Sequence, residues 1–140
     1  DKSLEVIILE NSARTAQDAA KALDCNVGAI VKSLLFRTGD DFILCLVAGD
    51  KRCSLNKLKK LKDKKDILMA SPEEVKTQTG YTIGGVSPIG HINNIEIIID
   101  KSLERFNQLF AAAGHPNCVF KINFINIQKI TNGKVEDIIE

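Results

Sequence analysis

A lysine interrupts the most apolar short run of this chain, and the run limits what the chain can fold into. The segment Ala29-Ile30-Val31-Lys32-Ser33-Leu34-Leu35-Phe36 is rich in large and β-branched apolar residues, which is typical of a β-strand. Alternation along a strand places Lys32 on the same face as Leu34 and Phe36. A charged side chain on an apolar face costs free energy unless it reaches water, is paired or lines a site. Two interpretations stay open: an edge lysine whose ammonium reaches water, or a lysine on a cavity wall that meets an anionic ligand.

Composition indicates one domain, spanning residues 1–140, with an ordinary hydrophobic core. The 140 residues are 44% hydrophobic and 26% charged, with a net charge of +1, which is typical of a soluble globular protein. No stretch approaches the roughly 20 continuous apolar residues of a membrane helix, so we expect no membrane partner. The chain shows no leader, although it begins at Asp1 rather than Met, so a leader further upstream stays open.

The four cysteines predict neither a metal site nor disulfides. Cys25, Cys45, Cys53 and Cys118 form no CxxC pair and have no nearby pair of histidines. We expect buried, reduced thiols, no bound metal and a cytoplasmic location.

The order of the predicted elements favours an α+β fold with a mixed, curled, barrel-like sheet surrounded by short helices, because strands and helices alternate without βαβ regularity. Gly39-Asp40-Asp41 predicts a hairpin turn, and Gly80 predicts the end of a helix. We expect strands at 4–10, 29–36, 42–48, 67–70, 95–100, 109–113 and 118–124, with a short last one after Asn132-Gly133. Helices should begin at Thr15, Ser54, Ser71, Ser102 and Asn126.

Charge is concentrated between residues 51 and 65. Lysines dominate this segment after Lys51-Arg52, and Asp63 is its one acid. Leu55, Leu58 and Leu61 recur at every third position and predict an apolar helix stripe surrounded by lysines. Such a helix is either an ordinary solvated face or a phosphate-binding face whose affinity falls with salt.

A glycine-rich loop follows the Ser71 helix. The segment 84–90, Gly-Gly-Val-Ser-Pro-Ile-Gly, can bring backbone groups close to a small polar ligand, although a plain tight turn is the simpler interpretation. It is not a dinucleotide or Walker loop, so we expect no cofactor. No nucleophile elbow or paired carboxylates accompany it, and His91 and His115 are more typical of ordinary loop histidines than of catalytic bases.

Several motifs together, in this order along the chain, resemble the YbaK-like, prolyl-tRNA-synthetase-associated editing domain. They are Arg14-Thr15-Ala16, Ile30 to Phe36, Leu46-Val47-Ala48-Gly49-Asp50, Ala70-Ser71-Pro72-Glu73-Glu74-Val75, Gly80 to Gly90 and Ala112-Ala113-Gly114. The likeness covers essentially the whole chain, and no synthetase catalytic portion is present, as in a free-standing member.

The resemblance implies hydrolysis of the ester that joins a wrong amino acid to a tRNA. Lys32 matches the family's essential strand lysine, which holds the phosphate region of the terminal nucleotide. The GxxxP loop, matched by Gly84 to Pro88, surrounds the aminoacyl group; its backbone helps to place the attacking water, and the terminal ribose hydroxyl assists. We therefore assign Lys32, Gly84 and Gly85 to catalysis, and Ser33, Val86, Ser87 and Pro88 to substrate binding. Lys57, Lys59, Lys60 and Lys62 are the candidate tRNA contacts.

The resemblance leaves several substrates and roles open. Gly-Gly-Val-Ser-Pro is closer to the YbaK type, associated with cysteinyl-tRNA(Pro), than to the alanine-specific relatives, whereas Glu10-Asn11-Ser12-Ala13-Arg14-Thr15 is nearer to other free-standing members. The expected function is deacylation of a mischarged tRNA(Pro) such as Cys-tRNA(Pro). The alternatives are an alanyl or other small-amino-acid substrate, a non-catalytic module that binds tRNA or a prolyl-tRNA synthetase, and an interaction domain without nucleic acid.

Overall fold

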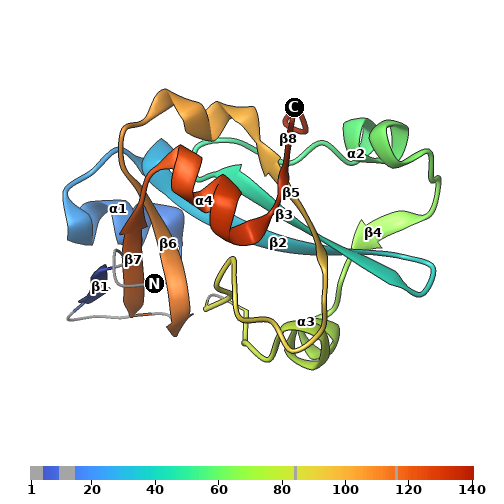
Figure 1. The fold of residues 1–140 in the computed structure, drawn as a ribbon, viewed down its shortest axis with the longest axis horizontal. Helices are drawn as coiled ribbons and strands as arrows, with labels where there is room; N and C mark the ends of the chain where they lie inside the picture. Colours follow the sequence, from blue (N-terminus) through green and yellow to red (C-terminus); the bar gives the residue numbers. More distant parts are fainter. Residues whose placement is uncertain (1–4, 10–14, 84, 116) are drawn as a thin grey trace.

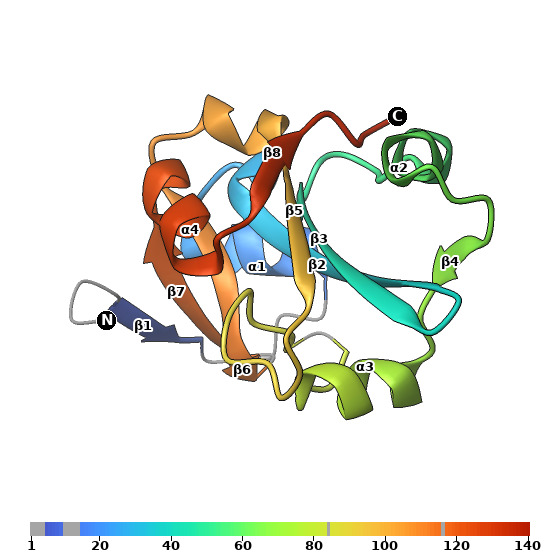
Figure 2. The same cartoon turned by 45° about the vertical axis from the view of Figure 1, so that its right-hand side comes forward.

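The computed structural model describes residues 5–9, 15–83, 85–115 and 117–140, and its strands form one curled sheet that does not close (Figures 1 and 2). The strand order is β1-β7-β6-β2-β3-β5-β8, with β4 also paired to β2. The pairs β2–β6, β3–β5 and β5–β8 are parallel and the others antiparallel, so the predicted mixed α+β fold is confirmed. The strands are β1 (Glu5–Ile8), β2 (Ile30–Thr38), β3 (Asp41–Ala48), β4 (Ile67–Met69), β5 (Glu96–Asp100), β6 (Leu109–His115), β7 (Cys118–Ile122) and β8 (Lys134–Glu136). The α-helices are α1 (Ala16–Leu23), α2 (Leu55–Lys62), α3 (Pro72–Thr79) and α4 (Phe124–Thr131), and η1 (Val27–Ala29) and η2 (Lys101–Arg105) are 3₁₀ helices.

Local capping signals set most of the helix starts. The side chains of Thr15, Ser54 and Ser71 each accept a hydrogen bond from the backbone N–H three residues later, at 3.0, 3.2 and 3.1 Å. Gly80 ends α3 in the left-handed conformation, at φ 85°. These four predictions are confirmed.

The start of the last helix was predicted wrongly. Asn123 caps α4 by accepting a hydrogen bond from the N–H of Asn126 at 2.7 Å, so the helix begins at Phe124. Phe124 fits the alternation of the preceding strand, and this pattern hides the capping asparagine one residue earlier. The predicted helix at Ser102 is the 3₁₀ helix η2, which begins one residue earlier.

Buried side chains pack on both faces of the sheet. Inside the curl, Leu44 and Leu46 of β3 pack with Ile97 and Ile99 of β5 and with Ile127 of α4. On the outer face, α2 contributes Leu58, which is fully buried. The predicted leucine stripe of α2 is therefore narrower than expected, because Leu55 and Leu61 remain 39% and 42% exposed.

One edge of β2 is paired only in part, and the resulting gap positions the candidate site. On one edge, β3 pairs with β2 from Val31 onward. On the other edge, Ile30 and Val31 pair with β6, and Phe36 to Thr38 pair with β4. In the described part of the chain, residues 32–34 have no strand partner on this second edge. Lys32 and its neighbours therefore face an opening between two strands that diverge.

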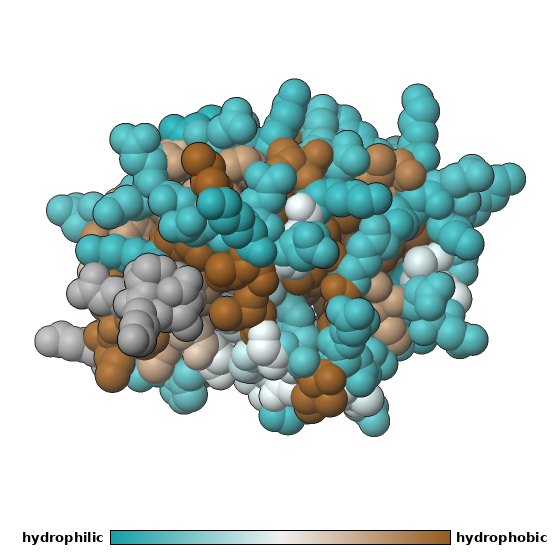
Figure 3. Space-filling view, viewed as in Figure 1, coloured by the Kyte–Doolittle hydropathy of each residue, from teal (hydrophilic) through white to brown (hydrophobic). Residues whose placement is uncertain are grey.

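The surface in Figure 3 is polar around its outline, and its largest hydrophobic area lies near the middle, below α4. Within the described ranges, no helix combines the length and the hydropathy needed to span a bilayer.

Candidate active site

Lys32 lines two neighbouring cavities. The first cavity, of about 420 Å³, lies along the gap in β2, between α1 and the loop that follows α3. Its walls are mainly apolar and include small side chains, which suits a small organic group. The lining residues are Thr15, Ala16, Gln17, Ala19, Ile30, Val31, Lys32, Ser33, Leu34, Gly49, Ile83, Val86, Phe110, Ala112 and Val119.

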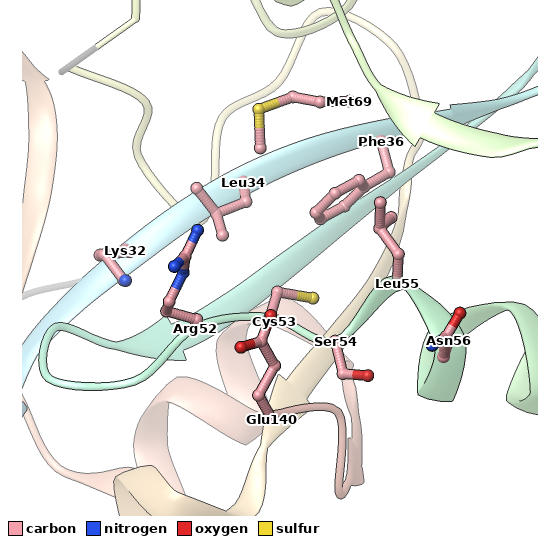
Figure 4. A pocket seen from close by; sticks show the side chains of 10 residues that line it. All are labelled: Lys32, Leu34, Phe36, Arg52, Cys53, Ser54, Leu55, Asn56, Met69 and Glu140. Carbon is pink, nitrogen blue, oxygen red and sulfur yellow. The ribbon is translucent and has the colours of Figure 1, made fainter.

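The second cavity, of about 480 Å³, lies on the other side of Lys32 (Figure 4). It is bounded by β2, by the segment that leads into α2 and by the end of β4. Figure 4 shows Lys32, Leu34 and Phe36 along one strand, with the Arg52 side chain reaching toward them from the opposite wall. The lining residues are Lys32, Leu34, Phe36, Arg52, Cys53, Ser54, Leu55, Asn56, Met69 and Glu140.

The Lys32 ammonium is half-buried and has no carboxylate in contact among the described residues. Its Nζ donates a hydrogen bond to the backbone carbonyl oxygen of Lys51. Burial lowers the pKa of Lys32 below its usual value, and the positive charge of Arg52 lowers it further, against the opposing effect of Asp50. A desolvated ammonium beside a second cation is an arrangement that an anionic ligand stabilises.

Ser33 carries a polar group without a partner at the same place. Its Oγ is buried and has no hydrogen-bond partner in the described part of the chain, although the residue lines the first cavity. Buried polar atoms are nearly always satisfied, so an unsatisfied hydroxyl beside a cavity indicates a group that a ligand or water completes.

The glycine-rich loop supplies the wall opposite Lys32. Val86 and Ile83 line the first cavity, and this places the loop across the gap from β2. Gly84 lies outside the described residues. The N–H of Gly85 donates to the carbonyl oxygen of Thr82 at 3.0 Å, so this amide serves the turn. A Cβ on Gly85 would lie 3.2 Å from the backbone of His115, which means that the loop packs closely against the end of β6.

Ser87 and Pro88, the other two loop residues assigned to substrate binding, are buried and do not line the first cavity. The Ser87 hydroxyl accepts a hydrogen bond from the N–H of Ile89 at 3.4 Å, and its carbonyl oxygen lies 2.7 Å from His91 Nε2. In this structure the Ser87 contacts hold the loop from within, and Pro88 is buried beside it.

Tyr81 holds the loop together, and the sequence analysis did not single it out. Its hydroxyl donates a hydrogen bond to the carbonyl oxygen of Ile89 at 2.8 Å, and its ring lies edge-on to that of His91. Tyr81 also fills the space beside Gly90 and Gly114, both at positive φ: a Cβ at Gly90 would meet the Tyr81 hydroxyl at 2.6 Å, and one at Gly114 would meet the ring at 3.0 Å. The available sequence signal was a lone tyrosine between Gly80 and the glycine-rich loop.

Gly49 and Asp50, the last two residues of the motif Leu46 to Asp50, both have contacts beside the site. A Cβ at Gly49 would lie 2.3 Å from the carbonyl oxygen of Val27 and 2.9 Å from Ala16, so glycine alone permits this approach of α1 to the cavity. Asp50 receives two hydrogen bonds from Arg105, at 2.8 and 3.2 Å, and this contact lowers the pKa of Asp50. Because Asp50 is engaged by Arg105, it neutralises Lys32 only in part.

The histidines lie beside the loop. His91 contacts the Ser87 carbonyl, as described above, whereas the exposed His115 accepts a hydrogen bond through Nδ1 from the N–H of Asn117 at 3.3 Å. Neither lines the first cavity.

The cysteines are free thiols in this structure. Cys45 alone is buried, whereas Cys25, Cys53 and Cys118 are half-buried, so the expectation of buried thiols was wrong for three of them. Cys53 lines the second cavity, and the neighbouring Cys45 thiol lowers the pKa of Cys53.

The lysines of α2 differ in their partners. Lys57 pairs with Asp137 at 3.0 Å, and Lys62 pairs with Glu96 at 2.6 Å. Lys59 and Lys60 form no ion pair with any described residue. Half of the candidate tRNA contacts are thus compensated by acids within the fold.

The chain matches a known family along most of its length. The family model described as an aminoacyl-tRNA editing domain matches residues 10–130. The uncharacterized protein YwhH of Bacillus subtilis (strain 168) is 36% identical over 132 residues, which cover 94% of this chain and 83% of that protein. A proline–tRNA ligase of Thermosipho melanesiensis is 30% identical over 92% of this chain, which spans only 22% of the ligase.

A solved structure shares the whole architecture. It is described as a candidate trans-editing enzyme for prolyl tRNA synthetase, and it superposes with a TM-score of 0.93 at 37% identity, over 98% of this chain and 87% of the other. The gap in β2, the lysine and the glycine-rich loop therefore occur in a fold that this chain shares with editing proteins. The chain belongs to the aminoacyl-tRNA editing domain family, in its YbaK-like, prolyl-tRNA-synthetase-associated form.

Proposed function

We propose that this protein is a trans-editing hydrolase, a single editing domain that deacylates mischarged aminoacyl-tRNA, with a mischarged tRNA(Pro) such as Cys-tRNA(Pro) as its substrate. The observation that carries the proposal is the convergence of Lys32, Ser33 and Val86 on one cavity in a chain of the editing family. The apolar, small-residue lining favours a small amino-acid side chain.

In the proposed reaction, the amino acid occupies the first cavity and Lys32 holds the phosphate of the terminal nucleotide. The loop backbone around Gly84 and Gly85 positions a water molecule, and a hydroxyl of the terminal ribose assists in its deprotonation. The water oxygen attacks the ester carbonyl carbon, the bond between that carbon and the ribose oxygen breaks, and the departing ribose oxygen takes up the proton that the water loses. The products are the free amino acid and the uncharged tRNA. Lys32 stabilises charge and orients the substrate without forming a covalent bond.

A deacylation panel tests the activity and the amino acid together. Cysteinyl-, alanyl- and seryl-tRNA(Pro) are incubated with the protein, alone and with a prolyl-tRNA synthetase, and release of the amino acid is followed against spontaneous hydrolysis. We expect the fastest release from Cys-tRNA(Pro). Faster release from Ala-tRNA(Pro) would reassign the amino acid, and release from none would contradict the enzyme and favour a binding module.

A further inference from the structure

The second cavity has the features of a nucleotide subsite, and it shares Lys32 with the first cavity. A substrate whose ester lies in the first cavity and whose phosphate meets Lys32 has to continue past that lysine. The second cavity begins at this point, so the neighbouring part of the same nucleic acid strand can enter it. Its volume of about 480 Å³ suits one nucleotide better than a large ligand.

The charges of the second cavity favour an anion. Lys32 and Arg52 both line it, and the two side chains lie close enough for the Arg52 charge to act on Lys32. Arg52 is exposed and forms no ion pair with any residue in the described ranges. The first turn of α2, at the rim, contains no acidic side chain. Lys32 and Arg52 are thus available to bind phosphate. The planar guanidinium of arginine can form two parallel hydrogen bonds to phosphate oxygens.

The floor of the cavity favours a flat, apolar group. Leu34 and Phe36 form its base, and Leu55 and Met69 remain 39% and 57% exposed at its edge (Figure 4). Exposed large apolar side chains at the edge of a cleft mark a surface on which the apolar face of a ligand, such as a nucleobase, can pack. Glu140, the one acid of the lining, offers an acceptor for an exocyclic amino group such as that of cytosine.

Resting on the proposed function, we propose that the second cavity binds the nucleotide that precedes the ester-bearing one. Its base covers Leu34, Leu55 and Met69, and its own 5′ phosphate meets Arg52. The phosphate that links the two nucleotides stays at Lys32. The protein therefore binds two nucleotides of the acceptor end, and Arg52 binds the one that precedes the ester-bearing nucleotide.

Short ester substrates separate the two subsites. The 3′-aminoacyl esters of adenosine 5′-monophosphate and of the dinucleotide pCpA carry the same reacting group, and only the dinucleotide reaches the second cavity. At neutral pH we expect wild type to prefer the dinucleotide ester by about tenfold in kcat/KM. Arg52→Gln should lower kcat/KM for the dinucleotide about tenfold and Met69→Ala about threefold, and both variants should lower kcat/KM for the mononucleotide ester clearly less. Lys129→Gln, an exposed charge removal on α4, should change neither substrate.

Equal rates for the two esters in wild type, or equal losses on both in Arg52→Gln, would overturn the subsite. If neither ester is hydrolysed, the deacylation panel with full-length tRNA decides the proposed function. Calorimetry with the unacylated trinucleotide pCpCpA then tests the second cavity separately. Binding to wild type that weakens about tenfold in Arg52→Gln would still support the subsite, whereas no binding, or binding that Arg52→Gln leaves unchanged, would overturn it.

Discussion

Strand β2 and helix α2 both carry lysines that could meet an anion, yet the surroundings of these lysines differ. Lys32 is a single lysine, half-buried on β2, beside Arg52 and with no contacting carboxylate among the described residues. On α2, the densest lysine segment of the chain, Lys57 and Lys62 are paired with acids from elsewhere in the fold. The comparison teaches that an uncompensated charge at a cavity, rather than the local density of charge, indicates an anion site.

The largest expected effect comes from Lys32. Lys32→Ala should reduce kcat/KM for deacylation of a mischarged tRNA(Pro) by about a hundredfold or more, the scale for loss of a positioned charge in an active site. The midpoint of thermal unfolding should hardly change, because the desolvated ammonium contributes little to stability. Lys57→Ala is the matched control, and we expect it to stay within about threefold of wild type because an exposed ion pair contributes little. Similar losses for the two variants would break the comparison.

The loop opposite Lys32 gives the next effect. Gly85→Ala places a Cβ 3.2 Å from the His115 backbone, which should push the loop away from β6 and displace Val86 from the first cavity. We expect about a tenfold fall in kcat/KM and a loss of about 1–2 kcal/mol in the free energy of unfolding.

Gly39→Ala serves as its control. Gly39 adopts φ 60° in the β2–β3 turn, far along the hairpin, so alanine there is strained as well. It should destabilise the protein by about 1 kcal/mol with kcat/KM unchanged. If activity falls equally in the two variants, loss of stability rather than loop position explains the effect.

The α2 lysines sharpen the comparison further. Lys59→Gln with Lys60→Gln should weaken tRNA binding several-fold and reduce the slope of log affinity against log salt by about 1 per lysine. Lys57→Gln with Lys62→Gln should have a smaller effect, because acids of the fold already compensate these charges. Fluorescence anisotropy with labelled tRNA at several salt concentrations measures both. An identical slope in wild type and both double variants would remove α2 from the tRNA-binding surface.

The smallest effect is a shift in pH dependence. Burial and Arg52 lower the pKa of Lys32 below 10.5, and only the protonated form holds a phosphate. Activity should therefore decline as the pH rises through this lowered pKa. Arg52→Gln removes one of the causes, so its decline should occur at higher pH than in wild type. Initial rates between about pH 7 and 10, corrected for spontaneous ester hydrolysis, measure the shift. A decline at the same pH in both proteins would contradict the coupling.

Local signals explain which parts of the fold were predictable from the sequence. Thr15, Ser54, Ser71 and Gly80 act on the backbone within a few residues of themselves, so their helix ends follow from local chemistry. The Asn123 cap was hidden because Phe124 continues the alternation of Phe120 and Ile122 in the preceding strand.

The site was less predictable because it depends on distant pairings. That β6 and β4 pair with opposite ends of β2, and so leave the gap at residues 32–34, is a matter of topology rather than of any local pattern. For the same reason, the sequence did not reveal that Ser87 and Pro88, which the resemblance assigns to substrate binding, are buried and lie outside the lining of the first cavity. Tyr81 and Gly49 matter through contacts with residues far along the chain, which one sequence does not reveal.

Removing the negative charge that Lys32 is proposed to meet tests the central claim most directly. The aminoacyl-pCpA ester is prepared with a neutral methylphosphonate in place of the linking phosphate, and kcat/KM is measured for wild type and Lys32→Ala. We predict that wild type loses about a hundredfold on the neutral substrate, whereas Lys32→Ala, already slow, loses almost nothing further. Equal fold losses in the two proteins would contradict the account, because they would show that Lys32 acts independently of that phosphate.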